Sequence, residues 1–198
     1  MIDLSTLVQQ CAPGVTPTVL HAIMSTESGF DPLALHVNNH VRLRSPPKTA
    51  AQAARWSEWL ISRGYSIDMG LMQINSRNLP TLNLTPAGAF DPCQNIRAGA
   101  TILTARYSQA AQAVGPGTKA LLQAISAYNT GNFQDGFRND YVARVLMNGA
   151  RFPAVPSLDL TCQLTRCTPR RTESARSMQP ATAETALGGF GATPQSQR

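Results

Sequence analysis

The sequence is poor in aromatic residues and in long apolar runs. Aromatic side chains make up 6% of the 198 residues, too few for a base-stacking surface, and the basic residues are scattered apart from Arg166 and the pair at 170–171. No segment approaches the roughly 18 consecutive apolar residues that a membrane-spanning helix requires. The composition therefore predicts no nucleic-acid partner and no membrane span.

Clustered metal ligands are also missing. Cys11, Cys93, Cys162 and Cys167 lack the Cys-x-x-Cys spacing of zinc sites, and only one of the three histidines lies near any of them in the sequence. Because structural zinc sites need such clusters, we predict no metal site and no cofactor.

The sequence does contain a series of helical patterns in its first 150 residues. With 42% hydrophobic residues, the chain can bury one compact core there. The apolar spacing predicts helices over residues 4–11, 16–28, 49–63, 92–113, 119–128 and about 135–148, with few and short strands. The predicted fold class is therefore α+β and predominantly helical.

The composition changes beyond about Phe152. The segment that follows is rich in Pro, Ser, Thr, Gln and Ala and has no sustained apolar period. Such a composition buries too little apolar surface to form a core. We predict one domain over residues 1–150 and a flexible, disordered tail over residues 151–198.

Glu27 lies at the C-terminal end of the helix predicted over residues 16–28. Counting back three, four and seven residues gives Met24, Ile23 and Leu20, so the carboxyl group projects from the apolar side of the helix. Burial and the negative end of the helix dipole both oppose ionisation and raise the pKa of a carboxyl group. Glu27 is a candidate general acid; the alternative is a Glu that faces solvent or pairs with an arginine.

Two further segments accompany Glu27-Ser28. They are Gly70-Leu71-Met72-Gln73, in a predicted strand and turn that line a groove, and Ala127-Tyr128-Asn129, at the end of the helix predicted over residues 119–128. In this order, across about residues 17–145, the three segments resemble the lytic transglycosylases of bacterial cell walls. The resemblance implies a goose-type lysozyme-like fold with a short β-hairpin region.

A closer resemblance is to the specialised transglycosylases of type IV secretion and conjugation systems. It rests on local features, namely Cys11-Ala12-Pro13 and residues 28–34, 37–39, 70–75 and 90–96. The chain departs from the general family in a longer insertion over residues 38–67 and in the Asp68-Met69 that precedes Gly70. This departure concerns the shape of the groove and the length of the bound substrate.

The resemblance implies cleavage of the β-1,4 bond between N-acetylmuramic acid and N-acetylglucosamine in peptidoglycan, with formation of 1,6-anhydromuramic ends. One Glu, here Glu27, acts first as acid and then as base, and the acetamido group of the substrate supplies the nucleophile. The implied substrate-binding residues are Ser28, Met72, Gln73, Tyr128, Asn129 and Tyr141. The hydroxyl of Ser28 could equally bond a backbone carbonyl, and Tyr141 also fits a role in core packing.

A second catalytic carboxylate is hard to find. Glycoside hydrolysis ordinarily uses two carboxyl groups about 5–9.5 Å apart. The first 150 residues hold eight acidic residues, of which Asp68 alone lies beside another of the matched segments. We therefore favour a single catalytic Glu and keep Asp68 as a lesser candidate.

The cysteines and the expected substrate both indicate the periplasm. Two disulfides, Cys11–Cys93 and Cys162–Cys167, are the economical interpretation, and four reduced thiols are the alternative. The first residues, Met1-Ile2-Asp3-Leu4, lack the basic start and the apolar core of a signal peptide, so export would need a signal that has been removed or another route.

The expected partners are peptidoglycan glycan strands and, through the tail, components of a secretion system. The net charge of +6 suits an anionic polymer. Trp56 and Trp59, on the helix predicted over residues 49–63, would either stack on sugar rings or anchor that helix. Two alternative functions remain: a lysozyme-type hydrolase that cleaves the same bond with water, and a non-catalytic peptidoglycan-binding assembly protein.

Overall fold

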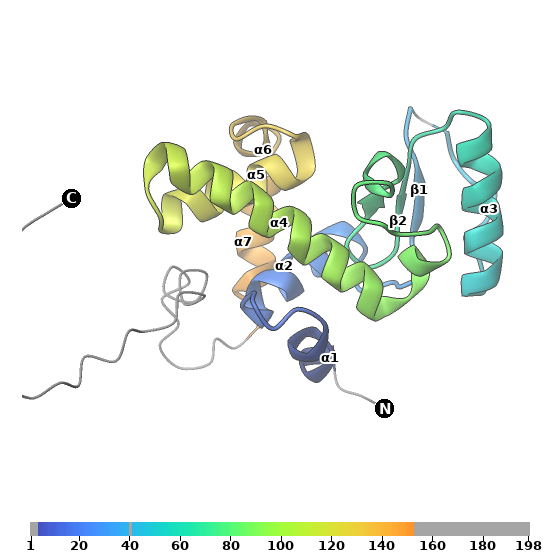
Figure 1. The fold of residues 1–198 in the computed structure, drawn as a ribbon, viewed down its shortest axis with the longest axis horizontal. Helices are drawn as coiled ribbons and strands as arrows, with labels where there is room; N and C mark the ends of the chain where they lie inside the picture. The colour runs from blue at the N-terminus through green and yellow to red at the C-terminus, as the bar shows by residue number, and fades with distance from the viewer. Residues whose placement is uncertain (1–3, 40, 153–198) are drawn as a thin grey trace, which may run out of the picture. The chain divides into compact units, whose positions relative to one another are not determined.

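The computed structural model describes residues 4–39 and 41–152, all of which belong to the larger of two compact units, residues 1–168 and 169–198. Within the described residues the chain forms seven α-helices, three short strands and two 3₁₀ helices (Figure 1). The helices are α1 (Leu4–Cys11), α2 (Pro17–Glu27), α3 (Ala50–Ser62), α4 (Pro92–Val114), α5 (Thr118–Thr130), α6 (Asp135–Arg138) and α7 (Tyr141–Gly149). The predicted mainly helical α+β class is confirmed.

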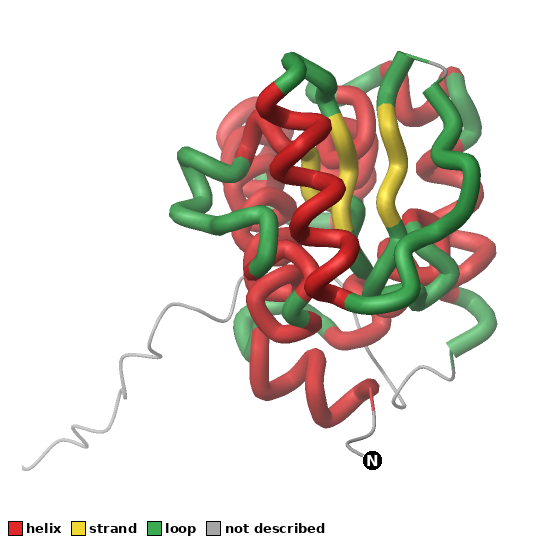
Figure 2. Tube along the Cα trace, turned by 90° about the vertical axis from the view of Figure 1, so that its right-hand side faces the viewer, coloured by secondary structure: helices red, strands yellow, loops and turns green. Residues whose placement is uncertain are grey.

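The strands form a small antiparallel sheet in the order β1-β2-β3. They are β1 (Leu35–Val37), β2 (Ile67–Met69) and β3 (Ile74–Asn75), followed by the 3₁₀ helices η1 (Ser76–Asn78) and η2 (Gly88–Phe90). Leu35 pairs with Met69, and Met69 pairs with Ile74, so β2 and β3 make the predicted short hairpin. Figure 2 shows a helix in front of the strands, and α3 contacts β2.

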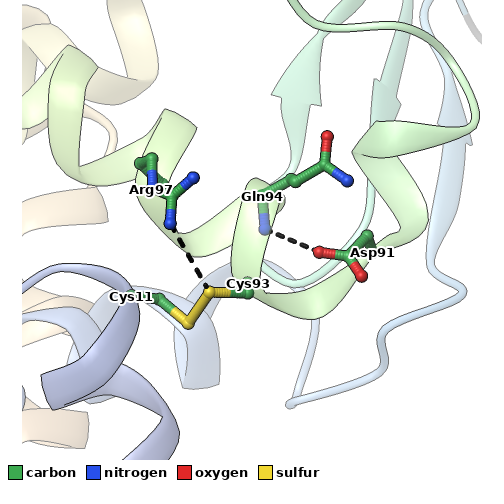
Figure 3. The surroundings of a disulfide bond; sticks show 5 residues. All are labelled: Cys11, Asp91, Cys93, Gln94 and Arg97. Carbon is green, nitrogen blue, oxygen red and sulfur yellow. Dashed lines mark hydrogen bonds between the residues drawn. A yellow bond between two sulfur atoms is a disulfide. The ribbon is translucent and has the colours of Figure 1, made fainter.

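Helix α4 is the longest helix, and it packs against α1 and α5 (Figure 1). Its start follows from the sequence: Asp91 is the N-cap and accepts a hydrogen bond from the backbone N–H of Gln94 at 2.8 Å, and Pro92 occupies the first turn (Figure 3). Ile96, Leu103 and Tyr107, which share one face by helical spacing, are buried.

The predicted disulfide between Cys11 and Cys93 is present (Figure 3). Its Cα atoms lie 5.2 Å apart and its ends are separated by 82 residues, so it joins the end of α1 to the first turn of α4. Cys162, Cys167 and the tail predicted over residues 151–198 lie outside the described residues, apart from its first two positions.

Helix α2 presents the apolar face that the sequence predicts. Leu20, Ile23 and Met24 have no exposed surface, and the helix packs against α7. Pro17 begins the helix and Glu27 is its last residue. The carboxyl group is therefore attached to the end of a well-packed helix.

The prediction of a single helix over about residues 135–148 is wrong. The chain forms α6 and α7 there, separated at Asn139 and Asp140, because Asp140 adopts a left-handed conformation with φ of 61°. The side chain of Asn139 accepts a hydrogen bond from the backbone N–H of Tyr141, the first residue of α7, at 3.0 Å.

Helix α5 also differs slightly from its predicted bounds. It continues through Asn129 and Thr130 and ends at Gly131, whose φ of 80° closes the helix. Asn129 is therefore part of the helix rather than of the turn after it. In residues 4–39 and 41–152, no helix has the length and apolar character needed to cross a membrane.

Candidate active site

A cavity of about 950 Å³ opens between the sheet and the helices. Its wall combines the end of α2, the strand and turn region, one side of α4 and the C-terminal end of α5. Of the residues predicted from the sequence, Glu27, Gln73, Tyr128 and Asn129 line it, together with Asp68. Ser28, Met72 and Tyr141 are absent from this wall.

Glu27 is half-buried in the wall of the cavity. Its Oε1 accepts a hydrogen bond of 2.5 Å from the hydroxyl of Tyr141. Burial raises the pKa of Glu27 to about 7; the Tyr141 hydrogen bond lowers this pKa, the negative charge of Asp68 raises it and the positive charge of Arg144 lowers it. The shift has the direction predicted from the sequence, and it leaves a substantial protonated fraction at neutral pH.

Tyr141 is a buried partner of Glu27. Its side chain is 2% exposed at the start of α7, with the guanidinium carbon of Arg144 5.9 Å from the centre of its ring. Burial and the nearby Glu27 raise the pKa of Tyr141 well above its usual value, so the hydroxyl keeps its proton and acts as a donor. Its position combines the two roles left open by the sequence, since it packs in the core and contacts the carboxyl group.

Asn95 organises the turn of residues 70–73, beside Glu27. It lies in the segment of residues 90–96 that supports the closer resemblance, but no role was predicted for it. Its fully buried amide accepts from the backbone N–H of Met72 at 2.7 Å. The same amide donates to the carbonyls of Met69 at 2.9 Å and Ala89 at 2.7 Å. One side chain on α4 thus holds three backbone groups, two in the segment of residues 69–72 and one in η2.

Two glycines, Gly70 and Gly99, allow the turn to lie close to η2 and α4. Gly70 has a φ of 72°, and an added Cβ would lie 2.4 Å from the carbonyl oxygen of Ala89. A Cβ at Gly99 would lie 2.6 Å from the methyl carbon of Met72. Met72 itself has no exposed surface, so its side chain packs against α4 and does not reach the cavity.

Tyr128 and Ser28 hold the same turn from two other sides. The hydroxyl of Tyr128 donates to the carbonyl of Met72 at 2.7 Å. The hydroxyl of Ser28 donates to the carbonyls of Leu71 at 2.8 Å and Met24 at 3.2 Å. Ser28 thus makes the backbone contacts that the sequence offered as an alternative, and both residues fix the turn relative to Glu27.

Gln73 and Asn129 present amide groups to the cavity. Gln73, with φ of 46°, donates through Nε2 to the carbonyls of Gly70 at 2.9 Å and Ala34 at 3.3 Å. Both bonds use the nitrogen, so the oxygen Oε1 is the atom that this side chain can offer to a ligand. The amide oxygen of Asn129 accepts from Asn139 at 3.3 Å.

Asp68 is the second carboxylate of the cavity, and two amides hold it. Asn38 donates to its Oδ2 at 3.0 Å, and Asn75 donates to its Oδ1 at 2.6 Å. Both asparagines line the same cavity. Across the described part of the chain, no three His, Cys, Asp or Glu side chains gather as metal ligands would.

Trp56 and Trp59 lie elsewhere. Together with Leu43 and Arg44 they line a separate slot of about 600 Å³ on α3. Trp59 is 53% exposed, and the guanidinium carbon of Arg63 lies 3.9 Å from its ring centre. Neither tryptophan lines the Glu27 cavity, so neither can stack on a sugar bound within it.

Comparison with known proteins gives a consistent result. A family model described as "Transglycosylase SLT domain" matches residues 6–145. "Protein virB1" of Agrobacterium fabrum is 41% identical over 143 residues, which cover 72% of this chain and 58% of that protein. "Type IV secretion system protein virB1" of Brucella abortus is 38% identical over 152 residues, covering 74% and 63%. The chain thus spans less than two thirds of the length of these relatives, and no solved structure matches it.

Proposed function

The chain belongs to the transglycosylase SLT domain family, and on this premise we propose that it is a peptidoglycan lytic transglycosylase. The matched residues 6–145 include Glu27, Gln73 and Tyr128. The observation that carries the proposal is a half-buried carboxyl group with a pKa of about 7 in the wall of a cavity of about 950 Å³. A group with this pKa can give up a proton and take one back near neutral pH.

The proposed reaction uses Glu27 twice. The protonated carboxyl group donates its proton to the glycosidic oxygen as the bond from C1 of N-acetylmuramic acid to that oxygen breaks. The acetamido oxygen of the same sugar attacks C1 and forms a cyclic intermediate. The carboxylate of Glu27 then takes the proton of the 6-hydroxyl as this oxygen attacks C1 and the bond from C1 to the acetamido oxygen breaks. This step yields the 1,6-anhydro ring, restores the acetamido group and returns Glu27 to its protonated form.

The surroundings of Glu27 support these two roles. The Tyr141 hydroxyl, which keeps its proton, can stabilise the carboxylate after the first step, while burial favours its reprotonation in the second. In our proposal Gln73 and Asn129 bind the N-acetyl sugars through their amides, and Tyr128 positions the turn that carries Gln73. Ser28 and Met72 contribute through the same turn rather than through contact with substrate.

The names of the relatives support a role beside a type IV secretion system. Because proteins of Brucella at 38% identity are named as type IV secretion system proteins, we propose that this enzyme opens the cell wall locally for such an apparatus. The Cys11–Cys93 disulfide supports a periplasmic location, since disulfides persist in oxidising compartments. The partner of the residues beyond 152 would then belong to the same apparatus.

The test is to incubate purified sacculi with the protein and with Glu27→Gln, and to analyse the soluble products by mass spectrometry. We expect the wild type to release 1,6-anhydromuramic ends and Glu27→Gln to release at least about 1000-fold less, because an amide cannot donate the proton. Glu58→Gln is the matched control, since Glu58 is an exposed carboxylate on α3 outside the cavity, and it should retain full activity.

The products also separate the alternatives. Reducing N-acetylmuramic acid ends without anhydro ends would identify a lysozyme-type hydrolase, a reaction in which Asp68 would be the second carboxylate. Binding of sacculi without any cleavage would instead identify a non-catalytic assembly protein. Activity of Glu27→Gln within tenfold of wild type would remove Glu27 from the mechanism.

A further inference from the structure

Two arginines line the same cavity as Glu27. Arg77 lies in η1 and Arg106 lies in α4. Arg106 is half-buried, whereas Arg77 is exposed. The cavity therefore combines a catalytic carboxyl group with two permanent positive charges.

Within residues 4–39 and 41–152, no carboxylate forms an ion pair with either of these arginines. Between residues 4 and 152, leaving aside position 40, the one ion pair joins Arg138 to Asp135, on α6. Arg106 donates to the neutral amide of Gln109 at 3.2 Å. The carboxylate oxygens of Asp68 are engaged by two asparagines, and Oε1 of Glu27 is engaged by Tyr141.

The register of α4 places Arg106 at a distance from the turn beside Glu27. Asn95 holds that turn, and Arg106 follows eleven residues later, about 16 Å further along the helix axis. Thr101, Ile102 and Ala105 lie between them and line the same cavity. The α4 side of the wall is thus continuous from the turn to Arg106.

We propose that Arg77 and Arg106 form a subsite for the carboxylate groups of the glycan strand, away from the bond that is cleaved. This inference rests on the proposed function. The sugar rings of peptidoglycan are uncharged, and its carboxylates are carried by the lactyl group of N-acetylmuramic acid or by the attached peptide. A guanidinium group matches a carboxylate with two parallel hydrogen bonds, and partial burial of Arg106 strengthens such a pair.

The subsite would give the enzyme a preference for anionic strands. A neutral N-acetyl sugar polymer such as chitin offers the same acetamido groups to Gln73 and Asn129 but no carboxylate. The two arginines would strengthen the binding of peptidoglycan strands and would add nothing to the binding of chitin.

The experiment measures binding in the Glu27→Gln background, so that no strand is cleaved. The probes are peptide-bearing glycan strands, strands whose peptides have been removed by an amidase, and a chitin oligosaccharide of matched length. We expect Arg77→Ala with Arg106→Ala to weaken binding of the peptide-bearing strands about 5- to 20-fold, and binding of the chitin oligosaccharide less than about twofold. The loss should shrink as salt is raised.

The probes also identify the source of the carboxylate. Loss confined to the amidase-treated strands would assign the subsite to the lactyl group, whose carboxyl group is an amide in the peptide-bearing strands and becomes a free carboxylate only after the amidase has acted. Loss with both anionic probes would mean that the subsite accepts either carboxylate. Loss confined to the peptide-bearing strands would assign it to the peptide. Unchanged binding of both anionic probes, or an equal loss with the chitin oligosaccharide, would overturn the inference.

Arg97→Ala is the matched control. Arg97 lies on the same helix and is exposed, and it does not line the cavity; its side chain lies by the disulfide (Figure 3). This variant should bind all three probes as the parent does. Absence of anhydro products with the wild type would reject the proposed function, whereas the binding measurement tests the subsite without any cleavage.

Discussion

At the scale of single residues, the acid strength of Glu27 depends on its contact with Tyr141. The two residues lie 114 positions apart in the sequence, and Oε1 of Glu27 lies 2.5 Å from the hydroxyl oxygen of Tyr141. Burial pushes the carboxyl group toward its protonated form, while the hydroxyl stabilises the ionised form. The balance between these two effects sets the pH range in which Glu27 can act as an acid.

We therefore expect turnover of sacculi to fall as the pH rises through about 7, because Glu27 loses the proton that it must donate. Initial rates of product release between pH 5 and pH 9 test this. A rate that stays constant up to pH 9 would contradict it.

Tyr141→Phe sharpens the same test. Loss of the hydroxyl removes a hydrogen bond that favours the ionised carboxyl group, so the midpoint of the fall should move to higher pH. Tyr128→Phe is the control, because the Tyr128 hydroxyl bonds the carbonyl of Met72 and not Glu27. It should slow turnover by about 10- to 1000-fold, because the turn that carries Gln73 is held less firmly, without moving the midpoint.

Glu27 should also make stability depend on pH. Its pKa is about 7 in the folded chain against an ordinary value of 4.5, so the stability that it contributes is complete below about pH 4.5 and is lost as the pH rises through 7. Glu27→Gln behaves like the protonated form at every pH. It should match the wild type near pH 4.5 and be more stable by about 2–3 kcal/mol at pH 8, since one pKa unit corresponds to about 1.4 kcal/mol.

Urea unfolding at pH 4.5 and pH 8 measures this difference. Glu58→Gln, which changes an exposed carboxylate on α3, should show no such dependence. Equal stability of Glu27→Gln and wild type at pH 8 would mean that Glu27 ionises without cost.

At the scale of helices and strands, periodicity predicted the elements whose apolar faces are regular. The stripe of α2 and the Asp91-Pro92 start of α4 are examples, and both place their helices correctly. The break between α6 and α7 was missed because Phe137, Tyr141 and Val145 follow one another at intervals of four residues, a helical spacing that runs across the break. The left-handed backbone of Asp140, which interrupts the helix, leaves no mark on that spacing.

The turn beside Glu27 also shows that local sequence patterns do not predict contacts between distant residues. Its polar residues could be recognised from the sequence, but the roles of Asn95, Asn38 and Asn75 could not. Asn38 and Asn75 donate to Asp68, 30 and 7 positions away, and Asn95 bonds backbone groups 6 to 26 positions away. Such contacts exist only once the strands and α4 have come together, so local patterns contain no signal for them.

We expect Asn95→Ala to destabilise the fold by about 2–4 kcal/mol, because it leaves a buried N–H and two carbonyls without partners. Thermal or urea unfolding tests this. Asn78→Ala is the control: Asn78 is exposed in η1, and its replacement should change stability by less than about 0.5 kcal/mol. If Asn95→Ala also lowered the free energy of unfolding by less than about 0.5 kcal/mol, other contacts would be holding the turn.

At the scale of the whole chain, the Cys11–Cys93 disulfide connects the first helix to the central one across 82 residues. Cross-linking a loop of this length restricts the unfolded chain and stabilises the fold by about 4 kcal/mol in the chain-entropy model. Cys11→Ser with Cys93→Ser should lower the free energy of unfolding by about that amount. Unfolding of the wild type with and without a reductant gives an independent measurement, and no effect of the reductant would contradict the prediction.

The contact between α2 and α7 also sets an order of events during protein synthesis. The ribosome makes Glu27 early, but Tyr141 and the rest of α7 are among the last described residues to emerge. A nascent chain that has reached only α5 therefore carries the acid without the hydroxyl that tunes it and without the helix that buries α2. The site is therefore complete only when almost the whole matched domain is available to fold, whether at the ribosome or after export.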